Sequence, residues 1–308
     1  KVDFAAGGGF INEKKKTGHD SKYLEDKAKA AGISILRGNE LKNAASHKER
    51  IICFSTDENK DDLKYAFDRR EGDTKLADFI QAGIDNLYAK YAKKGFFFMI
   101  EGGQIDHGGH DDDGITTFYE INDFANCVDI LLAFYNQHPD ETLIVITADH
   151  ETGALMLGAG QYEMHPEILT SQKYSEGVLN DMYKEFMGTD PKSAPDWEAV
   201  KGFLKKNLGL WDTVRVDPAT ESQLRATFER SRSGHGDNSV RTLYSVSTRI
   251  ISESIDVVNK RAGYSWAHGS HSGSPVGLYV KGAGYEAFLD CRDNTDIPKT
   301  IAKVAKYS

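Results

Sequence analysis

Two short apolar runs, separated by a helical pattern, constrain the fold of this chain more than any other feature. Residues 96–100 and 143–147 are almost entirely apolar, and each run is followed by a cluster of glycine or polar residues. Such runs are typical of strands that are buried on both faces. Between them, residues 116–136 place apolar side chains on one stripe at helical spacing. Strand, helix and strand with short connections form a βαβ unit, which predicts a parallel sheet.

The pattern on either side of this unit predicts further α/β structure. Upstream, we expect strands at residues 1–6, 33–36 and 51–54 and helices at residues 21–31 and 74–93. Downstream, a strand at 276–280 and a helix at 295–306 restore the α/β pattern after a long interruption.

That interruption consists of amphipathic helices, which we interpret as an insertion into one α/β domain. The predicted division has three parts: residues 1–157 form a partial α/β metal-binding core, residues 158–262 form a helical insertion or cap, and residues 263–308 return to the core.

The charge of the chain argues against one class of partner. The 308 residues carry a formal net charge of -9 and a pI near 5.6, whereas nucleic-acid binding requires a basic face. The same acidity opposes an anionic substrate, so a phosphate site would need local positive charge, for which bound metal is the obvious source. No apolar run approaches the roughly 20 residues that span a bilayer.

Three clusters of potential metal ligands lie beside predicted core strands. Residues 101–110 (EGGQIDHGGH) follow the first apolar run, and residues 147–151 (TADHE) overlap the end of the second. Residues 268–273 (HGSHSG) precede the last predicted strand. Ligand sites of open α/β sheets lie at the carboxyl ends of strands, so we expect the first two clusters at one edge.

The residue types in these clusters suit zinc and magnesium. Zinc prefers imidazole together with carboxylate, whereas magnesium prefers oxygen alone. Glu101 offers an oxygen ligand of the kind that magnesium prefers. The ligands suited to a pair of zinc ions are Asp106, His110, Asp149, His150 and His271. A single His or Asp in a loop is usually a cap or a solvated group, but three clusters at strand ends favour a metal site.

These motifs resemble those of the alkaline phosphatase family. The first cluster is similar to the family's E-G-G-x-I-D-H-x-x-H segment, the second to its T-A-D-H, and His271-Ser272-Gly273 to its H-[ST]-G. The order and spacing agree, and residues 266–296 resemble a bacterial branch. The resemblance implies an α/β three-layer sandwich with a largely parallel central sheet, incomplete here at the amino terminus, plus the helical insertion.

The resemblance also implies a role for each matching residue. Asp106, His110 and His271 correspond to ligands of one zinc ion, and Asp149 and His150 to ligands of the second. Glu101 corresponds to a ligand of one magnesium ion. His107 corresponds to a position beside the phosphate, and His268 either lines the site or is a solvated or capping residue.

The family's serine nucleophile lies in a D-S-A-type segment that has no counterpart here. An aspartate that bridges zinc and magnesium, a Ser/Thr magnesium ligand and a phosphate-clamping arginine are also missing. Because the sequence also opens in what reads as mid-strand, we expect a truncated chain that is inactive alone.

For the intact protein, the resemblance implies hydrolysis of phosphate monoesters through a phosphoserine, with export to a periplasm or the cell exterior and a possible homodimer. A phosphodiesterase, sulfatase or phosphomutase on the same metal scaffold is the alternative among enzymes. A metal-binding module without catalysis is the alternative outside them. Ser270 and Ser272 are the nearest candidate nucleophiles should the chain itself turn over substrate.

Overall fold

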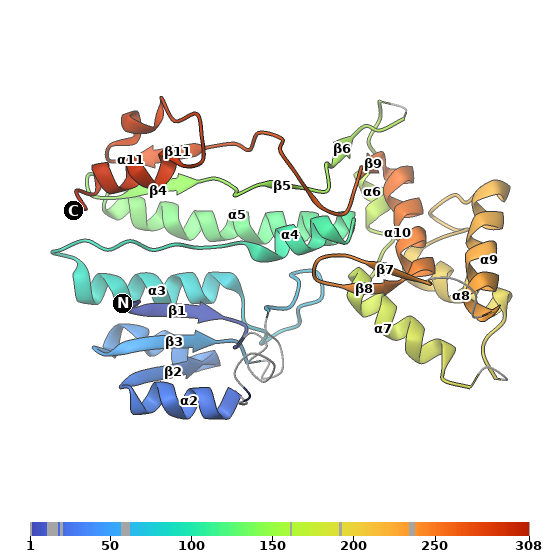
Figure 1. Ribbon diagram of the computed structural model, residues 1–308, viewed down its shortest axis with the longest axis horizontal. Helices are drawn as coiled ribbons and strands as arrows, with labels where there is room; N and C mark the ends of the chain where they lie inside the picture. The colour runs from blue at the N-terminus through green and yellow to red at the C-terminus, as the bar shows by residue number, and fades with distance from the viewer. Residues whose placement is uncertain are drawn as a thin grey trace.

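The chain forms an α/β unit joined to a helical unit (Figure 1). Both termini lie at the end of the α/β unit that is remote from the helical unit. The computed structural model describes residues 2–10, 18, 21–56, 62–160, 162–190, 193–233 and 238–307.

The first part of the α/β unit is a three-stranded parallel sheet with strand order β1-β3-β2. Its elements are β1 (Phe4–Gly7), α2 (Ser21–Ala30), β2 (Ile33–Arg37), the 3-10 helix η1 (Gly38–Ser46), β3 (Arg50–Phe54) and α3 (Leu76–Tyr91). Apolar side chains of the strands, including Ile51 and Cys53, are buried against η1 and α3. The predicted strands and helices of this region are therefore present, within a few residues of the expected ends.

The second part of the α/β unit contains α4 (Gly103–His110) and β4 (Leu143–Ile146), the helix and the strand from which the chain enters the candidate site. The helices α4 and α5 (Gly114–Gln137) follow each other closely and pack together. Asp113 caps α5, since its carboxylate accepts a hydrogen bond from the Thr116 amide. The strand β4 pairs in antiparallel fashion with β11 (Tyr279–Gly282), and α11 (Asp296–Val304) ends this part.

The prediction of a strand at residues 96–100 is wrong in one respect. This segment runs extended beside α3, but no strand among the described residues pairs with it. Phe98 and Ile100 pack against α3 and α5, whereas Phe97 and Met99 are 59% and 67% exposed. The side chains thus alternate between two faces as they do in a strand. The face with Phe97 and Met99 is exposed, whereas the continuous apolar run had suggested burial on both faces.

The helical unit follows the strand β6 (Met156–Leu157) in the chain. It contains α6 (Pro166–Leu169), α7 (Glu176–Met187), α8 (Trp197–Leu208), α9 (Pro218–Ser233), β7 (Ser239–Arg241), β8 (Val246–Thr248) and α10 (Arg249–Ala262). Its apolar core includes Leu204, Phe228 and Ile251, and it extends to Ile115 at the start of α5. The β7–β8 hairpin, which the helical pattern did not predict, reaches back toward α4 (Figure 1).

Two short strand pairs fix the ends of this unit on the α/β unit. The strand β6 pairs with β9 (Tyr264–Ser265), and β5 (Glu151–Thr152) pairs with β10 (His271–Ser272), both antiparallel. The short 3-10 helix η2 (Tyr285–Phe288) follows β11. Within the described ranges, no helix has the length and apolar character to cross a membrane.

Candidate metal centre

The helix α4 presents two of the predicted ligands on one face. Asp106 and His110 are four residues apart, so their side chains lie on the same side of the helix. Gly108 allows this helix to approach α5 closely, because a Cβ at that position would lie 2.9 Å from the Thr117 hydroxyl. Close packing at this glycine fixes the direction in which Asp106 and His110 point.

Three ligand atoms form a small triangle. His110 Nε2 lies 3.0 Å from His271 Nε2, Asp106 Oδ1 lies 3.5 Å from His110 Nε2, and the same oxygen lies 3.9 Å from His271 Nε2. Zinc bonds of about 2.0–2.1 Å in a tetrahedron place neighbouring ligand atoms about 3.3 Å apart. The triangle therefore matches three corners of a zinc coordination tetrahedron.

The tautomer of His110 makes Nε2 available as a ligand. Its Nδ1 lies 2.9 Å from the carbonyl oxygen of Gly269, which can only accept, so Nδ1 carries the proton and donates. In the neutral ring, Nε2 then presents a lone pair toward His271. A donor hydrogen bond from the other nitrogen is the usual support of a metal-binding histidine.

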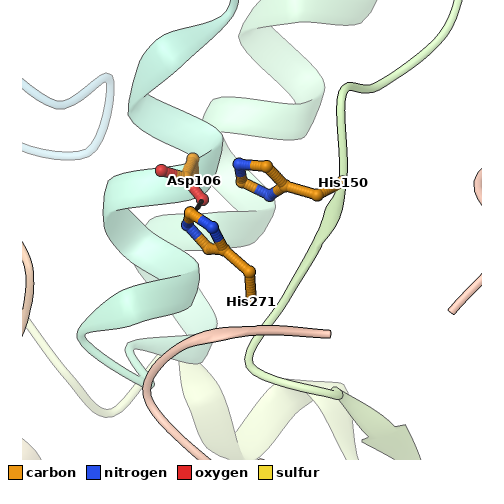
Figure 2. Close-up of side chains that lie close together, drawn as sticks. All are labelled: Asp106, His150 and His271. Atoms are coloured by element: carbon orange, nitrogen blue, oxygen red, sulfur yellow. Dashed lines mark ion pairs between the residues drawn. The ribbon is translucent and has the colours of Figure 1, made fainter. Parts of the chain in front are cut away.

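His150 approaches the same place from the segment after β4. Figure 2 shows its ring beside the carboxylate of Asp106, which comes from α4, and the ring of His271, which comes from β10. Ligand atoms of Asp106, His150 and His271 all lie within 4.8 Å of one another, and the His150 and His271 rings stack at 3.5 Å between centroids. Asp149 Oδ2 lies 3.3 Å from His150 Nε2, and its side chain is 86% exposed. The two predicted zinc sets therefore adjoin each other at His271.

Thr152 connects the two sets, although no sequence signal assigned it to the site. Its hydroxyl donates a short hydrogen bond to Asp106 and lies 3.3 Å from His150 Nδ1. One side chain thus touches a predicted ligand of each zinc ion. Its place two residues after His150, directly behind the cluster at 147–151, was the available clue.

The β5–β10 pair holds the segment of His271 in place. His271 is opposite Thr152 in the register, and the Ser272 hydroxyl donates to Glu151. Gly153, with φ at +82°, allows Trp266 to approach, because a Cβ there would lie 2.4 Å from the indole ring. The Gly153 amide donates to the Ser270 carbonyl at 2.9 Å. A left-handed glycine and a backbone hydrogen bond therefore fix the third ligand segment.

The remaining predicted residues lie around this cluster rather than in it. Glu101 is exposed at the start of the 101–110 segment. The ring of His107 packs against that of Tyr244 in the β7–β8 hairpin, with centroids 3.9 Å apart. The His268 side chain contacts Ser270, at 3.4 Å to its amide and 3.5 Å to its hydroxyl, and the His268 amide donates to the Gly153 carbonyl at 3.4 Å.

A second polar cluster lies behind α4, and we call it the buried carboxylate group. Hydroxyl groups surround Asp111, which accepts from Ser245 at 2.5 Å and from Thr242 at 3.3 Å. Its members are Asp111, Asp113, Glu120 and Glu176. Burial raises the pKa of Asp113 to about 6 and that of Glu120 to about 7, and it also raises the pKa values of Asp111 and Glu176.

The ligand cluster offers imidazole nitrogens and one carboxylate, which are donors that zinc prefers. Its ligand atoms come from α4, from the segment after β4 and from β10. The chemistry available to such a site, once loaded, is that of a Lewis acid next to an anion-binding surface.

The chain matches the family model described as alkaline phosphatase over residues 10–307. Alkaline phosphatase 4 of Bacillus subtilis is 28% identical over 309 residues, and alkaline phosphatase 3 of the same organism is 28% identical over 315 residues. These alignments cover 99% and 100% of this chain but 58% and 59% of the relatives, so the chain spans less than two thirds of their length.

A solved structure shares the fold. The cold-active alkaline phosphatase from the psychrophile Shewanella sp. superimposes with a TM-score of 0.70 at 24% identity. The superposition covers 97% of this chain and 64% of that protein. The likeness in three dimensions therefore extends along nearly the whole chain.

Proposed function

Because the chain belongs to the alkaline phosphatase family, we propose that it carries most of the metal ligands of a phosphate monoesterase. The observation that supports this proposal is the triangle of Asp106 Oδ1, His110 Nε2 and His271 Nε2, with edges of 3.0 to 3.9 Å. Buried or half-buried nitrogens that face each other need a shared cation or proton between them.

We assign a zinc ion to this triangle and a second zinc ion to His150 and Asp149. Glu101 is the proposed ligand of a magnesium ion. When bound, the metals supply Lewis acidity and positive charge to a phosphoryl group in transfer. That charge offsets the net charge of -9 of the chain, which otherwise repels a phosphate ester.

The residues of this chain have three tasks in the proposed reaction. The Gly269 carbonyl accepts from His110 Nδ1 and so favours the tautomer that leaves Nε2 for the metal. Thr152 orients Asp106 and contacts His150. His107, beside the ligand face of α4, is placed to donate a hydrogen bond to a phosphate oxygen.

The nucleophile is proposed to be a serine outside the residues of this sequence, acting through a phosphoserine. Neither candidate hydroxyl here suits the role. Ser272 donates its hydroxyl proton to Glu151, and Ser270 is exposed and contacts only His268 among its described side-chain partners. For the full-length protein we also propose export to a periplasm or the cell exterior, as is common in this family.

The test combines metal binding with a rate measurement on the purified chain. We expect saturable zinc binding in equilibrium dialysis, and no hydrolysis of 4-nitrophenyl phosphate above background with zinc and magnesium present. A chain that binds no zinc would remove the basis of the proposal. Clear metal-dependent turnover would show that a nucleophile lies within this sequence, and faster cleavage of a diester than of the monoester would favour a phosphodiesterase.

A further inference from the structure

One side chain of the helical unit, that of Tyr244, contacts the ligand face of α4. Tyr244 lies in the turn between β7 and β8, within the predicted insertion. Its ring packs on that of His107 with centroids 3.9 Å apart and an interplanar angle of 32°, and it meets the His110 ring edge-on at 5.2 Å. Although Tyr244 is 53% exposed, it thus covers two histidines of α4 in the candidate site.

The hairpin turn that carries Tyr244 is tied to the residue next to a ligand. Asp111 follows His110 directly, and its carboxylate accepts hydrogen bonds from Thr242 and Ser245. Inside the turn, the Thr242 hydroxyl accepts from the Ser245 amide at 3.0 Å and lies 2.9 Å from the Ser245 hydroxyl. The turn thus has one orientation relative to α4, and Tyr244 at its tip is directed by it.

The electrostatics of Tyr244 agree with these ring contacts. The pKa of its phenol is raised, first by partial burial and then by the negative charge of Asp106. The ring itself lies over the ligand face of α4, against His107 and His110.

We propose that Tyr244 is a positioning residue of the metal site, supplied by the helical insertion. Its ring packs against the imidazoles of His107 and His110 and keeps both on the ligand face of α4. This inference rests on the proposed function, and it assigns the insertion a part in the site instead of a purely structural role. Contacts between aromatic rings stabilise such geometries, and groups that support the ligands from outside affect metal affinity.

Two substitutions test the ring. Tyr244→Leu removes the ring contacts with His107 and His110, so zinc affinity should fall about tenfold and the affinity of the zinc-loaded chain for inorganic phosphate about fivefold. Tyr244→Phe keeps the ring, so both affinities should stay near those of the wild type. Leu243→Ala, at a neighbour that is 65% exposed, is the control and should change neither affinity.

A spectroscopic readout tests the contact directly. Zinc binding next to the phenol should produce an ultraviolet difference band of tyrosine in the wild-type chain, and this band should be missing in Tyr244→Phe. The band, together with a tenfold loss in Tyr244→Leu that Tyr244→Phe does not share, supports the proposal. Wild-type zinc affinity in Tyr244→Leu, or an unchanged difference band in Tyr244→Phe, would overturn it. A wild-type chain that binds no zinc at all would instead overturn the proposed function on which it rests.

Discussion

The metal-ligand cluster and the buried carboxylate group adjoin the same end of α4, yet they satisfy their polar atoms in opposite ways. Asp113 accepts hydrogen bonds from Thr116, Gln172 and the Glu176 amide, and all of these partners are buried. In the ligand cluster, by contrast, two imidazole nitrogens face each other at 3.0 Å. The first arrangement is complete without an added ion, whereas the second needs either a proton or the proposed zinc ion between its two nitrogens.

The difference shows why acidic residues alone are a poor guide to metal sites. The run Asp111-Asp112-Asp113 is the most acidic stretch near α4, but hydroxyl, amide and backbone donors occupy the carboxylates of Asp111 and Asp113. One oxygen of Asp112 is buried without a hydrogen-bond partner among the described residues. His110 and His271 instead point one nitrogen each toward the other. Sites that depart from complete hydrogen bonding within the protein are where function is expected.

The largest expected effect comes from removing a ligand. His271→Ala should weaken zinc binding by more than the roughly 10–100-fold that follows from losing a partner of a ligand. His165→Ala is the control, because His165 is 47% exposed and contacts only Glu163 and Glu167 among its described ion-pair partners. The measurement is competition with a chromogenic chelator. Equal zinc retention in both variants would contradict the assignment of His271.

The second prediction concerns the buried carboxylate group. Asp113→Ala should lower the free energy of unfolding by about 2 kcal/mol, because it removes a helix cap and leaves buried donors without a partner. Zinc affinity of the folded chain should change by no more than about twofold, because Asp113 does not touch the ligands. Urea denaturation and zinc titration check the two parts, and Asp113→Asn should recover part of the stability. A large loss of zinc affinity would show that the two clusters are not separate.

Thr152 lies between the ligands, so its substitution should have an intermediate effect. Thr152→Val keeps the shape but removes the hydroxyl that donates to Asp106, and zinc affinity should fall about tenfold. Thr152→Ser retains the hydroxyl and should bind zinc nearly as well as the wild type. Should valine and serine behave alike, the hydroxyl would have no role in orienting Asp106.

The smallest effect is a change in the dependence of stability on pH. Burial raises the pKa of Glu120 from 4.5 to about 7, so the folded chain holds a proton that the unfolded chain releases in this range. Its contribution to stability is complete below pH 4.5 and is lost as the pH rises through 7. Glu120→Gln should therefore flatten the decline of the thermal midpoint between pH 5 and about 7. An equal decline in both chains would place the dependence on other groups.

Much of the α/β unit could be predicted from the sequence because its signals are local. The strands at Ile33–Arg37 and Arg50–Phe54 and the helix at Gly114–Gln137 follow from short apolar runs and helical periodicity. The apolar run at 96–100 was misleading because periodicity reports the character of side chains, not whether a neighbouring strand is available.

The candidate site was only partly accessible to sequence reasoning. Asp106 and His110 fall within one short motif, and their spacing already places them on one face of a helix. Tyr244 carried no signal, because its partner His107 is far away in the sequence and the hairpin lies within a helical pattern. The buried carboxylate group was equally hidden, since burial of an acidic run depends on tertiary packing.

The pairing of β6 with β9 brings the chain back to nearly the same point after the helical unit. For a connection whose ends already meet, doubling its length costs only about 0.6 kcal/mol in closure entropy. Residues can therefore be added at small entropic cost in the exposed connections between these strands, whereas deletions inside the helices would open the apolar core around Leu204 and Phe228. A deletion of one residue just before β10 is different again, because it would turn the His271 side chain to the opposite face. Changes in chain length are thus tolerable in the connections of the helical unit and destructive next to His271.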